Sequence, residues 1–255
     1  GSSKEIMHPY YVEETSALVV IDGLRAIREL LKQEEINSDG ELYLSGYSGG
    51  GYVTMATHKY IEEYDLEYFD LKASFPAAGG YDMKVVRDFF FDQEVYETPY
   101  FMAYIAESYR TYYDIDTALA QQIFNEPYAQ RIINIFDGLF DGSQINSQLN
   151  DTVAVLIAPG FLSEPDNEKY SEISQLFEQN SLLDWIPEIP MYLYHGDADI
   201  TVPYQNTVDT YDVFLASGSP PEIIKLTTFE GADHYTGFVP YLESFMNTIM
   251  KLEGK

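Results

Sequence analysis

Residues 41–51 read ELYLSGYSGGG, and this stretch determines the fold class. It starts as a short apolar strand from Glu41 to Ser45, turns through a G-x-S-x-G pattern centred on Ser48, and continues as an expected helix to about Glu63. A serine hydroxyl becomes a usable nucleophile when a sharp turn projects it beside a base, and only small neighbours tolerate such a strained turn. The bare pattern arises by chance in roughly one chain in ten of this length, so its strand-turn-helix context carries the argument. The sequence therefore predicts Ser48 as a nucleophile.

The segments on either side of this turn alternate between helix and strand patterns. Apolar residues at helical spacing precede the turn, and the later part of the chain gives short apolar strands followed by helices. The expected elements are a helix at about 14–33, strands at 71–76, 191–195 and 222–229, and helices at about 204–216 and 241–252. Strands that alternate with helices indicate an α/β fold with a doubly wound, mostly parallel sheet.

The chain between residues 81 and 185 follows a different pattern. Its long polar and aromatic segments have helical spacing, so we expect a mainly helical insertion at 81–185 within a core formed by residues 1–80 and 186–255. Its aromatic residues include Phe89, Phe90, Phe91, Tyr96, Tyr100, Tyr104, Tyr109, Tyr112 and Tyr113. They admit two interpretations: they line an apolar substrate pocket as part of a lid, or they form the insertion's own core.

Two carboxylates follow the strand at 191–195, in the sequence HGDADITVP. Open α/β sheets assemble their sites at such strand ends, and a serine nucleophile with a histidine base needs a carboxylate to hold the imidazole in one tautomer. Asp197 and Asp199 compete for that role, and loop capping is the alternative for both. We favour Asp199 as the orienting acid. His195, at the strand end itself, is predicted to be structural.

The base is predicted to be His234, in the sequence FEGADH that follows the strand at 222–229. The chain holds four histidines; His8 precedes the first helix and His58 lies on the helix after Ser48, so neither occupies a strand-end loop. The resulting order of nucleophile, acid and base differs from that of the two other well-known serine hydrolase arrangements. Gly49 directly follows the nucleophile at a helix start, and its N–H is the predicted donor to an oxyanion.

Composition excludes several other classes of function. Forty-two Asp and Glu against 14 Lys and Arg give a formal charge of -28, which repels nucleic acid and anionic lipid headgroups. No apolar run approaches the roughly 20 residues of a membrane span. There is no cysteine, and no phosphate loop, zinc pair or calcium loop is recognisable, so we expect neither a cofactor nor a metal.

Residues 1–80 and 186–255 resemble the α/β-hydrolase superfamily, with Ser48, Asp199 and His234 in its order. The run from His8-Pro9-Tyr10 to Gly46-Tyr47-Ser48 is similar to secreted bacterial esterases and lipases related to fungal secretory lipases, and the segment after Gly80-Tyr81-Asp82 resembles their lid. The resemblance implies that Ser48 attacks an ester carbonyl, His234 removes and returns its proton, Asp199 orients His234, and water releases the acyl group. It also suggests a secreted or periplasmic location.

In that superfamily the nucleophile strand is about the fifth, after four strands and a loop that supplies a second oxyanion donor. We therefore expect the sequence to be the C-terminal part of a longer hydrolase, with the second donor upstream of Gly1. Gly1-Ser2-Ser3 resembles the small-residue loop that follows the fourth strand. The strand from Glu41 to Ser45 becomes an unprotected edge unless an upstream N-terminal segment or an oligomer partner covers it.

Three functions remain open on the sequence alone. The first is hydrolysis of carboxylic esters with short to medium acyl chains, with a small-molecule ester as substrate. The second is a serine peptidase of the prolyl-oligopeptidase type, which shares the triad, its order and the sheet. The third is a binding module without turnover, which an absent N-terminal half would favour.

Overall fold

The computed structural model describes residues 7–64, 66 and 69–255, which form two compact units. The sheet unit comprises Glu13–Asp82 and Ser181–Lys255. The helical unit comprises residues 7–12 and Met83–Asn180, so most of it lies within the stretch predicted as an insertion, 81–185. The small-residue segment Gly1-Ser2-Ser3 lies outside the described residues.

Within the described residues, four parallel strands form the sheet, in the order β1-β2-β3-β4, and this confirms the predicted α/β class. The strands are β1 (Glu41–Tyr47), β2 (Asp70–Ala77), β3 (Met191–Gly196) and β4 (Ile224–Phe229). The helices of this unit are α1 (Glu13–Gln33), α2 (Gly49–Glu63), α11 (Tyr204–Ser217) and α12 (Phe238–Leu252). Their bounds differ by at most a few residues from the expected ones. The end of α11 illustrates a local signal, because it is followed by Gly218, whose φ is 111°.

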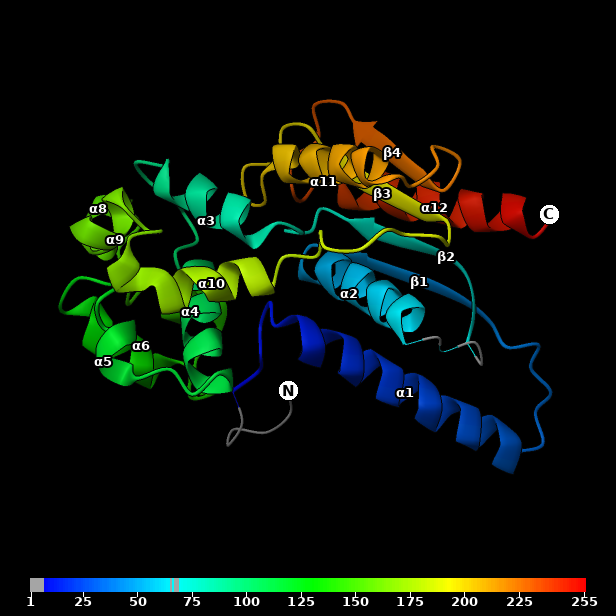
Figure 1. The fold of residues 1–255 in the computed structure, drawn as a ribbon, viewed down its shortest axis with the longest axis horizontal. Coiled ribbons are helices and arrows are strands. Elements are labelled where there is room, and N and C mark those ends of the chain that lie inside the picture. The colour runs from blue at the N-terminus through cyan, green and yellow to red at the C-terminus, as the bar shows by residue number, and fades with distance from the viewer. Residues whose placement is uncertain (1–6, 65, 67–68) are drawn as a thin grey trace. The chain divides into compact units, whose positions relative to one another are not determined.

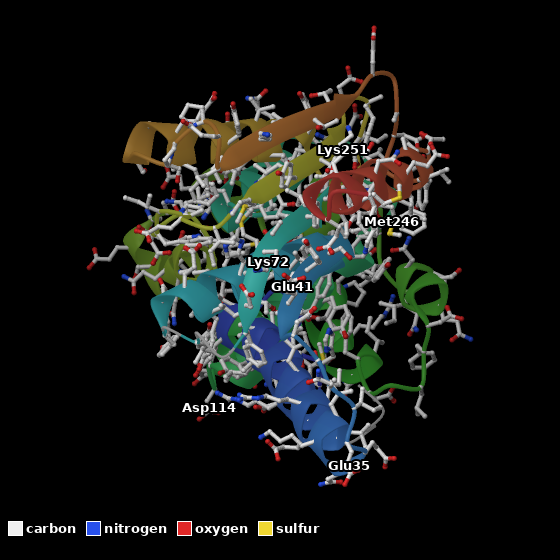
Figure 2. The ribbon with its side chains drawn as sticks, turned by 90° about the vertical axis from the view of Figure 1, so that its right-hand side faces the viewer. Glu35, Glu41, Lys72, Asp114, Met246 and Lys251 are labelled. Atoms are coloured by element: carbon white, nitrogen blue, oxygen red, sulfur yellow. The ribbon has the colours of Figure 1, made fainter. Side chains whose placement is uncertain are left out.

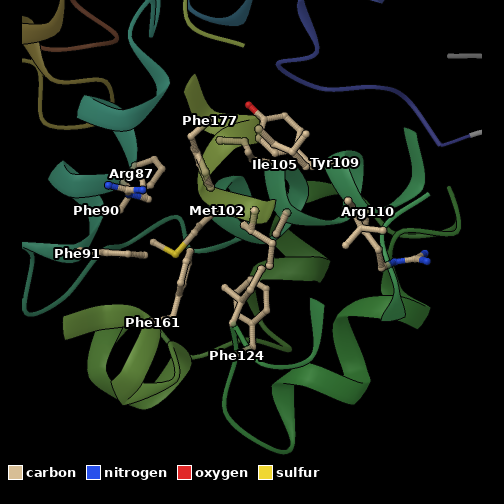
Figure 3. A pocket seen from close by; sticks show the side chains of 15 residues that line it. Arg87, Phe90, Phe91, Met102, Ile105, Tyr109, Arg110, Phe124, Phe161 and Phe177 are labelled. Atoms are coloured by element: carbon tan, nitrogen blue, oxygen red, sulfur yellow. The ribbon is translucent and has the colours of Figure 1, made fainter. Parts of the chain in front are cut away.

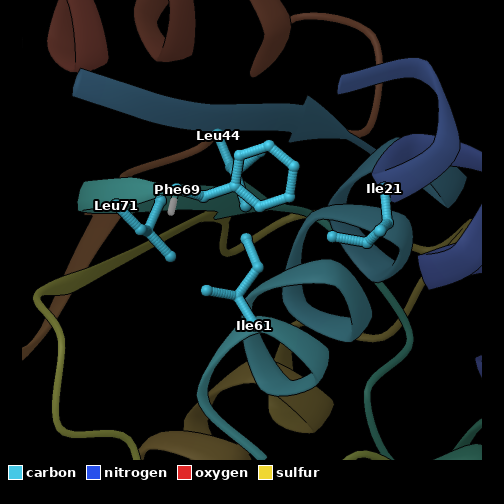
Figure 4. Packing of buried hydrophobic residues seen from close by; sticks show 5 residues of the cluster. All are labelled: Ile21, Leu44, Ile61, Phe69 and Leu71. Carbon is cyan, nitrogen blue, oxygen red and sulfur yellow. The ribbon is translucent and has the colours of Figure 1, made fainter. Parts of the chain in front are cut away.

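Helices cover both faces of the sheet. In Figure 1, α2 and α11 lie in front of the strands and α12 lies behind them. On the first face, a cluster formed by Ile21, Leu44, Ile61, Phe69 and Leu71 joins α1, α2, β1 and the start of β2 (Figure 4). Burying each such side chain contributes roughly 1.5–3 kcal/mol, so this cluster fixes α2, and with it the turn at Ser48, against the strands.

The opposite face is aromatic. Phe75, Tyr194 and Tyr241 belong to the cluster between the strands and α12, and the Tyr241 hydroxyl donates to the Phe75 carbonyl at 2.9 Å. In the sheet between these two clusters, the register of β1 against β2 shifts by one residue: Leu42 pairs with Leu71, but Tyr43 pairs with Ala73. A bulge of this kind re-aims side chains between the two faces of a sheet.

One side of the sheet unit keeps apolar surface exposed. Among the described residues, β1 has β2 as its one neighbouring strand, and the Glu41–Lys72 ion pair at 3.4 Å joins the two (Figure 2). The buried residues of α1, Ser16, Ala17 and Ile21, lie in its first half, and Ile27 is 54% exposed because α1 runs past the cluster formed with α2. On α12, Met246 is 51% exposed.

The helical unit is built from many short elements. They are α3 (Met83–Phe91), α4 (Tyr100–Tyr112), α5 (Thr117–Ala120), α6 (Tyr128–Ile135), α7 (Gly142–Asn146), α8 (Val153–Leu156), α9 (Pro159–Ser163), η1 (Glu168–Tyr170) and α10 (Ser171–Gln179). No helix among the described residues is long and apolar enough to cross a membrane.

An aromatic core holds these helices together. Rings and aliphatic side chains of α3, α4, α9 and α10 surround a cavity of about 30 Å³, whose wall includes Phe90, Met102, Tyr109, Phe161 and Phe177 (Figure 3). An apolar cavity of about 150 Å³ is known to bind benzene, so this much smaller space is a packing void. The aromatic residues of the insertion therefore serve, at least in this part, as its own core.

Candidate active site

The turn at Ser48 is strained and closely packed. Ser48 has φ 59° and ψ −127°, a conformation that non-glycine residues rarely adopt. Its N–H donates to the Ala77 carbonyl at 2.8 Å, which ties the turn to the end of β2. A Cβ on Gly46 would lie 2.1 Å from the Gly50 oxygen, and one on Gly51 would lie 2.3 Å from the Ala77 oxygen. Only glycine at these two positions allows the backbone segments to approach closely enough to form the turn.

His234 lies beside the serine hydroxyl. It follows β4 by a short loop, and its Nε2 is 2.9 Å from Ser48 Oγ, a hydrogen-bonding distance. The Tyr47 hydroxyl donates to the backbone carbonyl of His234 at 2.9 Å and thereby fixes the loop to the end of β1. Burial, followed by the nearby charges of Asp199 and Asp233, raises the pKa of the Tyr47 phenol, so it remains a proton donor.

Asp199 lies on the far side of the imidazole ring. Its Oδ2 is 2.6 Å from His234 Nδ1, and its Oδ1 accepts the backbone N–H groups of Thr201 and Val202 at 2.8 and 2.9 Å. Burial by itself raises the pKa of the Asp199 carboxyl, but the hydrogen bonds from His195 and His234 outweigh burial and hold it well below the usual range. The carboxyl is therefore ionised, as an acid that orients an imidazole must be.

The competing carboxylate points elsewhere. Asp197 Oδ1 accepts the backbone N–H of Gly231 at 2.6 Å and so joins the loop after β3 to the loop after β4. Asp197 thus occupies the loop-capping role that was the alternative for both carboxylates. Among the two, only Asp199 lies at hydrogen-bonding distance from His234.

The remaining histidines have other surroundings. His58 is fully buried, with Nδ1 2.7 Å from Ser74 Oγ and Nε2 3.0 Å from Glu62, whose carboxylate also accepts the backbone N–H of Ile189. This network ties α2 to the segment that leads into β3. His8 lies in the helical unit, with its ring centroid 6.2 Å from that of Tyr104.

The first turn of α2 follows Ser48 directly. The first N–H groups of a helix have no intrahelical acceptor, so the Gly49 N–H is available to an anion. The second donor, predicted upstream of Gly1, lies outside the described residues. Among the parts of the chain that the structure covers, no group of three or more His, Cys, Asp or Glu side chains is arranged to hold a metal ion.

The parallel sheet, the strained turn between β1 and α2, and the loops after β3 and β4 define an α/β-hydrolase fold. The rice cell wall degrading esterase LipA of Xanthomonas oryzae is similar in structure, with 25% sequence identity, a TM-score of 0.82, and matches over 100% of this chain and 68% of that one. A Legionella pneumophila protein matches with 23% identity and a TM-score of 0.87, over 97% of this chain and 66% of that one.

Lipase A of Candida antarctica, in its closed state, shares the fold at 18% identity and a TM-score of 0.69; the match covers 91% of this chain and 54% of the lipase. The chain thus spans about two thirds of the esterase and about half of the lipase. No protein-family model matches the sequence, and no curated protein matches it. The chain therefore has the α/β-hydrolase fold of esterases and lipases and corresponds to part of their structures.

Two residues near the site escaped the sequence reasoning. Tyr47 occupies a variable position of G-x-S-x-G, where nothing in the pattern indicates its bond to His234. His195 is predicted to be structural; it precedes Asp199 by four residues, and its Nε2 lies 3.1 Å from Asp199 Oδ2, a contact that the prediction does not include. For His195 the spacing to Asp199 was the available signal; for Tyr47 there was none.

Proposed function

We propose that this protein is a serine hydrolase that cleaves carboxylic esters with short to medium acyl chains through an acyl-enzyme on Ser48. The proposal rests on two consecutive hydrogen-bonding contacts. Ser48 Oγ lies 2.9 Å from His234 Nε2, and His234 Nδ1 lies 2.6 Å from Asp199 Oδ2. Nucleophile, base and orienting acid within such distances are the signature of activated-serine chemistry. The similarity to esterase and lipase structures favours esters as the substrate class.

The proposed reaction has two halves. Ser48 Oγ attacks the ester carbonyl carbon while His234 Nε2 takes the hydroxyl proton, and the tetrahedral intermediate then expels the alcohol, which leaves with that proton. Water next attacks the acyl-enzyme and gives its proton to His234, which returns it to Ser48 as the carboxylic acid departs. Asp199 stays ionised throughout and stabilises the imidazolium that forms in each half.

The oxyanion of each tetrahedral intermediate needs donors. We assign one to the Gly49 N–H, at the positive end of α2. A second donor, upstream of Gly1, remains part of the proposal; a site that lacks one such donor loses roughly a hundredfold to a thousandfold in rate.

We also propose that further polypeptide covers β1, either an upstream segment or a second copy of the chain. Large apolar side chains are exposed on both helices that flank this strand, for example Leu30 (55%) on α1 and Met250 (44%) on α12. Exposed apolar patches beside an unpaired strand edge are typical of interfaces. A dimer by light scattering would identify a second copy, whereas a monomer that gains activity on N-terminal extension would identify an upstream segment.

The helical unit is proposed to act as a lid. Its cavity of about 30 Å³ is too small for an acyl chain, so we do not assign the substrate's acyl group to the interior of this unit. Selectivity for acyl length is instead expected to depend on the surfaces that a lid presents to bound substrate.

A chain-length series of nitrophenyl esters, with a nitroanilide of a prolyl peptide alongside, tests the function. We expect hydrolysis of the shorter esters, little amide hydrolysis, and a loss of about a thousandfold or more in kcat for Ser48→Ala. Ser163→Ala, at an exposed serine of the helical unit, is the matched control. Faster cleavage of the amide would favour a peptidase, and equal rates for wild type and Ser48→Ala would exclude Ser48 as the nucleophile.

A further inference from the structure

His195 lies directly behind the acid of the site. It occupies the end of β3 and is fully buried. Its Nε2 is 3.1 Å from Asp199 Oδ2 and 3.2 Å from the Val202 carbonyl, and its Nδ1 is 2.6 Å from Thr207 Oγ1 on α11. The reaction described above gives this residue no part.

These contacts determine which ring nitrogen carries the proton. Both partners of Nε2, a carboxylate and a backbone carbonyl, are acceptors, so Nε2 must be the protonated nitrogen. Nδ1 then accepts the hydroxyl proton of Thr207. In this tautomer every polar atom of the buried ring has a partner of the correct kind.

The carboxylate of Asp199 is saturated in the same arrangement. An ionised carboxylate offers about four acceptor positions. Oδ1 receives two backbone N–H groups, and Oδ2 receives one N–H from each of two imidazole rings, those of His234 and His195. His195 therefore shares with His234 the one oxygen that orients the base.

We propose that His195 is a positioning residue of the hydrolytic site, which donates Nε2–H to Asp199 Oδ2 and so fixes both the direction and the basicity of that oxygen toward His234. The inference rests on the proposed function, and it gives this buried histidine a role in setting the pH range of activity. Without the His195 donor, Oδ2 interacts more strongly with the protonated form of His234. The base is then available only at higher pH.

The other ionisable groups around this pair lie on three elements. Among the described residues they are Asp233 and Tyr235, on the loop after β4, Tyr47, at the end of β1, and Tyr204, at the start of α11. The Tyr235 ring centroid lies 5.9 Å from that of His234, and the Tyr204 ring centroid lies 5.8 Å from that of His195. None of them is changed in the variants below, so a shifted pH profile reports on His195 itself.

The tautomer can be read in the unmodified protein. Nitrogen-15 NMR of the imidazole rings distinguishes protonated from unprotonated nitrogens, and four histidines are few enough to assign by single substitutions. We expect His195 to carry its proton on Nε2 at neutral pH. A proton on Nδ1 alone would overturn the proposal, because Nε2 would then have no proton to donate to Asp199.

Kinetics then separate positioning from packing. His195→Phe keeps the approximate volume of the ring but removes the N–H donor. We expect its kcat/KM to fall roughly tenfold to a hundredfold. We also expect the acid limb of its pH profile, the range in which activity rises with pH, to move to higher pH. His195→Gln supplies an amide N–H near the Nε2 position and should recover most of both effects. Equal losses in the two variants with an unmoved acid limb would indicate a packing role and overturn the proposal.

A milder pair of variants covers the case in which His195→Phe does not fold. Thr207→Val removes the donor to Nδ1, which weakens Nε2–H as a donor and should move the acid limb in the same direction by a smaller amount. Thr210→Val is the matched control, since Thr210 is an equally buried threonine of α11 whose hydroxyl donates to the Asn206 carbonyl. Identical pH profiles for the two variants would contradict the proposal.

Failure of the proposed function gives a different result. A protein without esterase activity, or with activity unaffected by Ser48→Ala, removes the reaction but leaves the NMR observation intact. In that case the His195 tautomer, and the change in the His234 N–H resonance on His195→Phe, still decide whether His195 acts on Asp199.

Discussion

The phenol of Tyr47 donates a hydrogen bond to the backbone carbonyl of His234 at 2.9 Å. The two residues belong to opposite edges of the described sheet, since Tyr47 ends β1 and His234 follows β4. The Tyr47 ring also contacts Phe238 and Tyr241 of α12, with ring centroids 5.3 and 5.4 Å away. One side chain therefore joins the turn at Ser48, the loop that holds His234 and the last helix.

Tyr47→Phe should loosen the loop that holds His234 while it retains the ring contacts. We expect kcat/KM for a nitrophenyl ester to fall several-fold and the free energy of unfolding to fall by about 1 kcal/mol, the net value of one hydrogen bond. Steady-state kinetics and urea unfolding of the same preparation measure both. Wild-type values for both quantities would show that the hydrogen bond does not hold His234.

The two neighbouring aspartates should respond very differently to amidation. Asp199→Asn replaces a saturated carboxylate with an amide that cannot accept the Nδ1 proton of His234 in the same way, and losses of about ten-thousandfold in kcat are known for such a change. Asp197→Asn keeps an acceptor for the Gly231 N–H and should cost less than tenfold. The reverse ranking would assign the orienting acid to Asp197.

Gly46 and Gly50 provide a matched test of the turn. Gly46→Ala places a methyl group 2.1 Å from the Gly50 oxygen and should destabilise the protein by about 1–3 kcal/mol or more. A methyl group on Gly50 meets nothing within 4 Å, and alanine favours the helix, so Gly50→Ala should leave the stability unchanged or raise it by up to about 1 kcal/mol. The midpoints of urea unfolding of the two variants measure this difference. Similar midpoints would mean that the turn does not require glycine at position 46.

The stability of the sheet unit should depend on acid pH through Asp199. The pKa of this carboxyl is lower in the folded state than the unfolded value of about 3.9, so its contribution is complete above that value and is lost as pH falls toward the folded pKa. The stability difference between wild type and Asp199→Asn should therefore shrink as pH drops from 5 to about 2. A difference that stays constant over this range would contradict the assigned pKa direction.

Much of the sheet unit could be predicted because its signals are local. The strand before Ser48 and the helix after it follow from a few neighbouring residues, and parallel-strand logic then brings the loops containing Asp199 and His234 to the same end of the sheet. The choice of Asp199 over Asp197 as the orienting acid stays a prediction; Asp199 Oδ2 lies 2.6 Å from His234 Nδ1, whereas Asp197 Oδ1 accepts the backbone N–H of Gly231.

The features that the sequence did not predict depend on contacts between residues that are far apart in the sequence. The bond between Tyr47 and His234 spans 187 positions, and no local pattern encodes it. Ile27 is 54% exposed because α1 extends beyond the cluster that it forms with α2, and the amphipathic spacing of α1 does not show where that contact ends. In the helical unit, Arg87 is buried against Asp166 and Ser174, a pairing across 79 and 87 positions that single-helix spacing could not indicate.

The central claim, that Ser48 is a nucleophile activated by His234, is tested most directly by a fluorophosphonate that reacts covalently with activated serines. Mass spectrometry of the intact protein and of its peptides gives the number and position of the labels. We predict one phosphonyl group per chain, on Ser48, with none on Ser48→Ala and much slower labelling of His234→Gln. Labelling at another residue, equal labelling of Ser48→Ala, or no labelling of the wild type would contradict the claim.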